Sequence, residues 1–471
     1  MTRRFLVLAT LVAPCLALEL RAQAQVQQQS ARRLELTTSS AEARTAFWAA
    51  IDASSNIFPL RAREFARKAA SSDSTFALAR AFIAATATDL TTAQRNAELD
   101  RAVSDAAHAS TAELLFAAWV RANVLGKTDE ARALADATAA LLPNDPNIAF
   151  YRAQLAPASQ VPEAMRDVTR KFPEYAPAYN ILAYQLWAKG DRNGAMEFVR
   201  QYVRLAPNQP NAHDSFAELL QFSGRFPEAL QHYDAAARID SAYDQAYAGI
   251  GEVHMLMGHG DQARIAYLKA VEKAPTTADR INAMSDRATT YIIDGKSKDA
   301  VRELANVAAS AEQAGLKPQA AAIHRAVAVI EATFGDRKTV AGHLSKAAEI
   351  GGSEEPAQHR MSALAYALSG DVATARSAAA RFQRAAGTGT VEQQNDLHEL
   401  FVVIAVAEKD LTRAQSELSQ AGAAPLGRAV VAEALKKAGR KSEADSLRTE
   451  ILGAGTVTLF DVIARAKVSK L

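Results

Sequence analysis

The side chains best suited to chemistry in this sequence are the two histidines and two methionines of residues 254–259. Imidazole nitrogens and thioether sulfurs bind soft metals such as copper. His254, however, falls at a core position of a predicted helix, while Met257 and His259 fall at the helix end and in the following turn. Methionine is also a common filler of helical cores. The pattern therefore favours core and turn positions, with a copper-type site as the alternative, and predicts no metal or other cofactor.

No motif that assembles a catalytic centre occurs in the sequence. HExxH, GxSxG, a phosphate-binding glycine loop followed by Lys-Ser/Thr, and a dinucleotide fingerprint are all missing. Glu354 and Glu355 are adjacent carboxylates, but they follow two glycines in a stretch typical of a solvated loop. Cys15 is the only cysteine, so a chain that has lost it can have neither thiol catalysis nor disulfides. We therefore expect a non-enzymatic protein.

A repeat of 34 residues organises the middle of the chain, over residues 178–275. The same residue types return at this step in three sets: Gly190, Gly224 and Gly258; Ala195, Ala229 and Ala263; and Leu182, Phe216 and Ile250. A fixed period of this length is typical of stacked arrays in which each repeat is one small supersecondary unit.

Each repeat has the pattern of two helices joined by a glycine turn. Tyr179, Leu182 and Leu186 follow a three-then-four step, which puts them on one helical face. Gly190 can adopt the left-handed conformation found just past a helix end. Asp191 can then cap the second helix. Alanine is abundant and strand signals are few, so the sequence predicts an all-α fold.

This pattern resembles the tetratricopeptide repeat (TPR). The first regular repeat matches the family motif in residue type at Tyr179, Leu182, Ala183, Leu186, Gly190, Ala195, Val199 and Pro207. The next two repeats match in the same register, except at His213, Ser241 and His254. The resemblance implies an α-solenoid, a right-handed superhelix of about 10–11 stacked helix pairs.

Breaks in the period suggest how the chain is divided. Residues 43–314 would form one array, with 178–275 as its most regular part, and residues 315–471 a second, more degenerate array. A Gly-Leu-Lys-Pro stretch suggests a hinge near 310–318. Leu459–Val468 is expected to be a closing helix with a polar outer face, as the ends of repeat arrays require.

The first 42 residues are expected to lie outside the arrays. Two arginines, an apolar run and a small-x-small site predict a secretory signal peptide over residues 1–24. Residues 25–42 are polar and are predicted to be a flexible leader. The protein is therefore expected in the periplasm or outside the cell, with an uncleaved signal anchor or a lipid on Cys15 as alternatives. No later stretch suggests a membrane span.

Charge gives no reason to expect nucleic acid as a partner. The whole chain has 54 Lys and Arg against 52 Asp and Glu, and loss of residues 1–24 leaves equal numbers of each. A balanced chain has no general electrostatic attraction to phosphate backbones.

In TPR proteins the first helix of each pair lines a concave, ligand-binding face, and the resemblance implies such a face here. The positions that match are Asn180, Tyr184 and Trp187 in the first regular repeat, Asp214, Glu218 and Gln221 in the second, and Glu252 and Met255 in the third. The centre of this face would be acidic, so a neutral or basic protein or peptide segment is the expected ligand. The Lys, Asn and Arg set with which TPR co-chaperones hold a C-terminal carboxylate is not matched.

The sequence thus suggests a scaffold for protein or peptide binding in the bacterial cell envelope. An envelope protein that binds a metal or a small ligand is the alternative.

Overall fold

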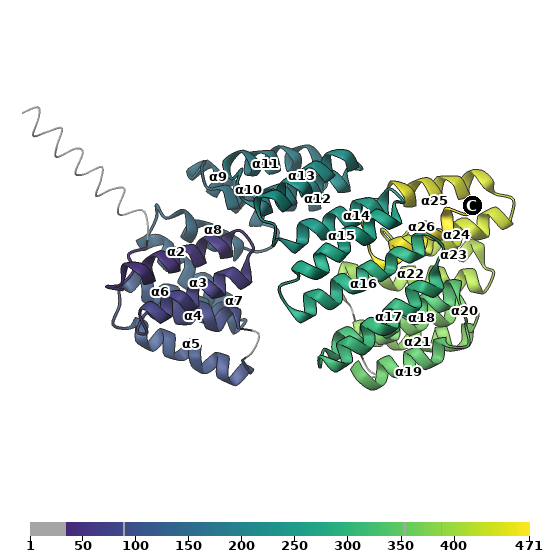
Figure 1. The fold of residues 1–471 in the computed structure, drawn as a ribbon, viewed down its shortest axis with the longest axis horizontal. Coiled ribbons are helices and arrows are strands. Elements are labelled where there is room, and N and C mark those ends of the chain that lie inside the picture. Colours follow the sequence, from purple (N-terminus) through teal and green to yellow (C-terminus); the bar gives the residue numbers. More distant parts are fainter. Residues whose placement is uncertain (1–33, 88–89, 352–354, 388) are drawn as a thin grey trace, which may run out of the picture. The chain divides into compact units, whose positions relative to one another are not determined.

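The computed structural model describes residues 34–87, 90–351, 355–387 and 389–471, and these residues form helices and no strand (Figure 1). The signal peptide predicted over residues 1–24 lies outside the described residues. The helices up to residue 207 are α2 (Ala41–Ser55), α3 (Pro59–Ser72), α4 (Ala77–Thr86), α5 (Thr92–Ala106), α6 (Thr111–Val124), α7 (Thr128–Leu141), α8 (Pro146–Gln154), α9 (Val161–Lys171), α10 (Ala176–Ala188) and α11 (Arg192–Leu205). Those that follow are α12 (Pro210–Phe222), α13 (Phe226–Ile239), α14 (Asp244–Leu256), α15 (Gly260–Lys273), α16 (Thr277–Ile293), α17 (Ser297–Gln313), α18 (Lys317–Phe334), α19 (Val340–Gly351), α20 (Pro356–Ser369), α21 (Val372–Ala386), α22 (Val391–Ala407), α23 (Leu411–Leu418), α24 (Pro425–Lys437), α25 (Lys441–Gly453) and α26 (Leu459–Val468).

Within the described residues, α2 to α25 pack as twelve successive helix pairs, and α26 follows them. The predicted all-α solenoid is confirmed, although the pairs outnumber the expected 10–11. Gly190, Gly224 and Gly258 have φ angles of 85°, 72° and 76°, in the left-handed region that favours glycine. The predicted cap of α11 is also present, because an Asp191 carboxylate oxygen accepts a hydrogen bond from the Gly194 amide at 2.9 Å. None of the described helices has both the length and the apolar character needed to cross a membrane.

The chain forms two compact units, of which the first ends at Pro207 and the second begins at Asn208. The arrays expected over 43–314 and 315–471 do not coincide with these units. The hinge expected near 310–318 is a short turn at Gly315, inside the second unit, between α17 and α18, which pack on each other. The loosened period has a local cause, because α16, α17 and α18 have 17, 17 and 18 residues where α14 has 13.

The core of the first unit is built around aromatic rings. Phe47 packs edge-on against Phe76 and Phe82, with ring centroids 5.0 and 5.2 Å away. Trp119 stands where the TPR motif has a small residue, and it is buried with its ring centroid 5.2 Å from that of Phe116. Large rings therefore fill the space between neighbouring helix pairs in this unit.

The core of the second unit is mostly alanine, valine, leucine and isoleucine, and the last helix belongs to it. Helix α26 packs against α16, α24 and α25, and Val462, Ile463 and Ala464 are all buried. The helix has the predicted bounds, but the expected polar outer face is wrong because neighbouring helices cover more than one of its sides. Buried Arg465 also donates hydrogen bonds to the carbonyls of Leu256, Leu452 and Ala454, at the ends of α14 and α25.

Residues 34–40 form an extended segment that leads into α2. Leu34, Leu36 and Thr38 are buried, while the residues between them are exposed. The flexible leader predicted over residues 25–42 is therefore wrong for its described part, since this part is packed or helical. The rest of that leader lies outside the described residues.

Candidate functional site

A row of carboxylates follows the first helices of three consecutive pairs in the second unit. Glu218 on α12, Glu252 on α14 and Asp286 on α16 are each 34 residues apart, so they occupy the same position in successive repeats. Asp214 lies one helical turn before Glu218 on α12. We call these four residues the acidic row. Asp286 is not among the residues predicted from the sequence, although the 34-residue step from Glu252 leads to it.

Three members of the acidic row, Asp214, Glu252 and Asp286, have pKa values raised above the ordinary carboxyl range. Burial and the neighbouring Glu218 carboxylate raise the pKa of Asp214 to about 8, against a hydrogen bond with Tyr243, which lowers it. Burial likewise raises the pKa of Glu252 to about 7, with Asp286 and Glu218 adding to the effect. Neighbouring protein atoms raise the pKa of Asp286 to about 6 by desolvation, although this residue is exposed at the surface. Within the described residues, no Lys or Arg contributes to the pKa shifts of Asp214, Glu252 or Asp286. A cation brought to this row would offset the repulsion and favour the ionised carboxylates.

Gln221 is buried and makes hydrogen bonds both to the acidic row and to the segment that precedes α26. Its side chain is fully buried, and its amide nitrogen donates to Glu252 Oε2 at 2.9 Å and to the Gly455 carbonyl at 3.1 Å. Tyr233 donates to its amide oxygen at 3.1 Å. The expectation that Gln221 faces a ligand is therefore corrected, because the segment at Gly455 covers it. Gln221 instead holds Glu252 in place.

The motif offsets also assign Met255 wrongly to the ligand-binding face. It is 2% exposed and belongs to the hydrophobic core of the second unit. A ligand on the surface of α14 cannot reach a side chain that packs between helices.

The predicted positions in the first unit differ in exposure. Asn180 is 2% exposed, so it does not present its amide to a ligand as expected. Tyr184 and Trp187 are half-buried, and the Arg192 guanidinium lies over the Trp187 ring at 3.9 Å from its centroid. These three residues lie on α10 in the first unit, whereas the acidic row belongs to the second.

The methionines and histidines of residues 254–259 lie in different environments. Met255 is in the core, Met257 is 38% exposed, and the His254 and His259 ring centroids are 5.8 Å apart. Among the residues that the structure describes, no group of three or more His, Cys, Asp or Glu side chains could hold a metal ion. This placement favours the core-and-turn interpretation of the segment.

Known proteins align with this chain over part or most of its length. No family model matches the sequence. DnaJ homolog subfamily C member 7 of Mus musculus is 27% identical over 120 residues, which are 24% of this chain and 23% of that protein. The aligned part thus spans about a quarter of that relative's length.

Solved structures of TPR proteins also align with the chain. Yeast Tom70 is 12% identical, with 86% of this chain and 88% of that chain covered and a TM-score of 0.43. TTC0263, a TPR protein of Thermus thermophilus, is 20% identical, with 37% and 98% covered and a TM-score of 0.33. YrrB, described as a TPR protein with an unusual peptide-binding site, is 16% identical, with 39% and 96% covered and a TM-score of 0.29. The chain is similar to TPR proteins.

Proposed function

We propose that this protein is a non-catalytic scaffold whose second unit binds a basic segment of a partner protein along the acidic row. The observation that supports this proposal is the spacing of Glu218, Glu252 and Asp286, which puts one carboxylate on each of three neighbouring helices. A row of evenly spaced acceptors suits an extended peptide that carries Lys or Arg side chains at intervals. A Lys or Arg side chain beside these carboxylates favours their ionised form and offsets their mutual repulsion, which favours binding and sets the orientation of the ligand.

The proposed location is the bacterial cell envelope, on the strength of the signal peptide expected over residues 1–24. Cell fractionation tests the location, and N-terminal sequencing of the purified protein tests the cleavage expected after Ala24. A chain that starts at Met1 and remains in the cytoplasm would contradict this part of the proposal.

The test of the acidic row is a crosslinking capture of the tagged protein's partners, followed by a binding titration. Glu218→Lys/Glu252→Lys should lose the captured protein, with affinity reduced about tenfold or more because two like charges now meet the ligand. Glu272→Lys is the matched control, since Glu272 is exposed on α15, the second helix of its pair. Binding that survives the double reversal, or that Glu272→Lys reduces equally, would contradict the proposed site.

Salt dependence gives a second readout. Surface electrostatic attraction weakens as the Debye length falls from about 10 Å at 0.1 M to about 3 Å at 1 M salt. The wild-type affinity should therefore fall with salt, whereas any residual affinity of the double variant should not.

A further inference from the structure

The extended segment of residues 34–38 is held on the first unit as a peptide ligand would be. Its side chains alternate between buried and exposed, which is the pattern of a strand lying on a surface. Leu34 and Leu36 contribute apolar contacts to the aromatic core of this unit. The rest of the attachment is made by polar groups of three different helix pairs.

Two buried carboxylates receive the main-chain amides of the segment. The Leu34 amide donates to Asp145 Oδ2 at 2.8 Å, and the Thr37 amide donates to Glu113 Oε1 at 2.9 Å. Asp145 and Glu113 are each 1% exposed. A hydrogen bond to a main-chain amide does not depend on the side chain at that position, so this mode recognises an extended backbone of many sequences.

Each carboxylate lies at the start of a helix, which fixes its position or stabilises its charge. Asp145 caps α8, because its Oδ1 accepts from the amides of Asn147 and Ile148 at 2.9 and 3.2 Å. Glu113 lies in the first turn of α6, where the helix dipole favours a negative charge. Its second oxygen, Oε2, is buried and has no hydrogen-bond partner among the described residues. The groove therefore offers one acceptor that its present occupant does not use.

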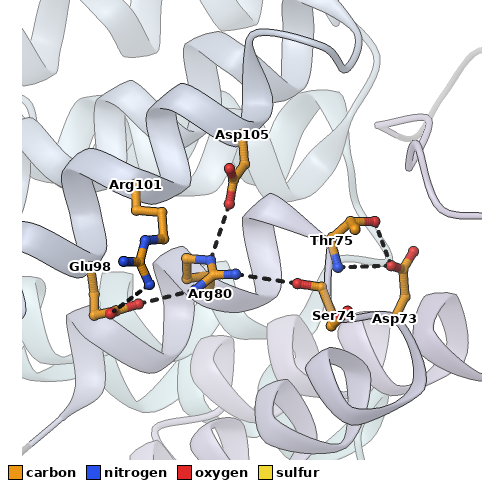
Figure 2. Close-up of polar contacts among 7 residues, drawn as sticks. All are labelled: Asp73, Ser74, Thr75, Arg80, Glu98, Arg101 and Asp105. Carbon is orange, nitrogen blue, oxygen red and sulfur yellow. Dashed lines mark hydrogen bonds and ion pairs between the residues drawn. The ribbon is translucent and has the colours of Figure 1, made fainter.

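A third carboxylate selects a hydroxyl at the end of the segment. Thr38 Oγ1 donates to Asp73 Oδ2 at 2.6 Å. Figure 2 shows how this acceptor is fixed: Thr75 donates its amide and its hydroxyl to Asp73 Oδ1, at 3.0 and 2.7 Å. Arg80 braces the same turn, since it donates to the Ser74 carbonyl at 3.2 Å (Figure 2).

Ion pairs with the adjacent helix hold the Arg80 side chain in place. It pairs with Glu98 and Asp105 of α5, each at 3.2 Å, and Arg101 shares Glu98 (Figure 2). The turn that carries Asp73 is therefore positioned by helices α4 and α5, and not by the segment that it binds.

We infer that the first unit contains a docking groove for an extended protein segment with apolar residues at alternate positions followed by threonine, and that residues 34–38 occupy this groove in cis. Asp145 and Glu113 form the main-chain acceptors, Asp73 selects the hydroxyl, and the core contacts of Leu34 and Leu36 define two apolar subsites. A partner segment of the same pattern competes with the cis segment. This groove lies in the first unit and does not depend on the acidic row.

The cis segment has the advantage of its covalent connection. A tethered ligand acts at an effective concentration of the order of millimolar, so a free peptide of equal intrinsic affinity binds the intact chain poorly. Disruption of the cis segment should unmask the groove without altering it.

The test uses the full chain with Leu34→Asp/Leu36→Asp, which we call the opened variant. The probe is a fluorescein-labelled peptide of residues 34–40 with an acetylated N-terminus, so that the amide of Leu34 remains a donor. Fluorescence anisotropy should show saturable binding to the opened variant and binding at least about tenfold weaker to the wild type. A peptide with serine in place of both leucines is the ligand control and should not bind.

The groove is tested by a further substitution in the opened variant. Glu113→Gln weakens a charged acceptor and should lower the peptide affinity about tenfold. Glu130→Gln removes the same charge at an exposed position of α7 and should have no effect.

Two results would overturn the inference. One is an opened variant that keeps its helical signal by circular dichroism but binds no peptide at millimolar concentration. The other is loss of helical structure both in the opened variant and in the milder Leu36→Ala, which would make the segment part of the folded core and not a replaceable ligand.

Discussion

Each compact unit holds one segment that lies outside its helix pairs, and the balance of contacts differs between the two. The first unit holds residues 34–38 through two buried leucines and through hydrogen bonds from main-chain amides and a hydroxyl to three carboxylates. The second unit encloses α26 among apolar side chains, with Val462, Ile463, Ala464 and Val468 all buried. Apolar burial on several sides makes a helix part of a core, whereas an extended segment held by two apolar side chains and a few polar contacts can exchange as a ligand does.

The largest expected effect comes from placing a charge among the apolar side chains that surround α26. Ile463→Asp puts an unpaired carboxylate at a fully buried position, which should lower the free energy of unfolding of the second unit by about 3–5 kcal/mol. The three tryptophans, Trp48, Trp119 and Trp187, all lie in the first unit, so their fluorescence reports that unit alone. Urea unfolding should show an earlier transition by circular dichroism and an unchanged transition by fluorescence. Ser469→Asp, at an exposed position, is the control.

The next effect tests how tightly the regular repeats of the second unit are packed. A Cβ atom at Gly249 would lie 2.3 Å from Tyr233 Cε1, so Gly249→Ala forces the ring to move and should cost about 1–3 kcal/mol. Gly342 lies in α19 with nothing within 4 Å of such an atom. Gly342→Ala should therefore stabilise the second unit by up to about 1 kcal/mol, because alanine is the better helix former. Equal effects of the two substitutions on the circular dichroism midpoint would contradict this account.

A pH titration should separate the two units by the sign of their response. The raised pKa values of Asp214 and Glu252 mean that the folded second unit binds more protons than the unfolded chain. Its stability should therefore fall as pH rises from about 6.5 to 8, by the order of 1 kcal/mol. Burial lowers the pKa of His232 and His254, so near the ordinary histidine pKa of 6.5 these residues bind more protons in the unfolded chain than in the folded unit. Their opposing contribution fades above about pH 7.5, where the decline should be clearest.

The first unit should respond to acid instead. Hydrogen bonds from Thr38 and Thr75 lower the pKa of Asp73, so its stabilising contribution is complete above the ordinary pKa of 3.8 and is lost as pH falls below it. Urea midpoints by fluorescence should be flat from pH 6.5 to 8, while those by circular dichroism decline. Asp214→Asn should flatten the decline; an unchanged slope in this variant would mean that other groups cause it.

The smallest effect concerns the cis segment. Thr38→Val removes the hydroxyl that donates to Asp73, which should speed hydrogen exchange of the Leu34 and Thr37 amides about tenfold without moving the unfolding midpoint. Thr45→Val, at an exposed position of α2, is the control. A fall in the fluorescence midpoint as large as that which Ile463→Asp causes by circular dichroism would abolish the contrast between the two units.

Local features of the fold were predictable because short stretches of sequence determine them. The turn at Gly190, the cap at Asp191 and the bounds of α26 all follow from helical periodicity and from residues that begin or end helices. The acidic character around Glu218 followed in the same way, from one position carried along the repeat.

Long-range contacts were not predictable, since no spacing encodes them. The burial of Gln221 depends on Gly455, and the order of residues 34–38 depends on Glu113 and Asp145. Motif offsets give the place of a residue on its helix, but they do not show which distant segment covers it. The division of the chain at Pro207 falls inside its most regular repeats, where the period gives no sign of it.

The closure of the second unit by its last residues sets the order in which the chain folds during synthesis. Hydrogen bonds join Gln221 to Gly455 and Leu256 to Arg465, across 234 and 209 residues. A simple repeat array can fold progressively, because each unit needs only its neighbour. Here the first unit can fold once Pro207 has emerged from the ribosome, whereas the second keeps the apolar surface that will receive α26 exposed until α26 itself has emerged. A nascent chain of this protein therefore exposes apolar surface that a chaperone can bind throughout the interval between the synthesis of α16 and that of α26.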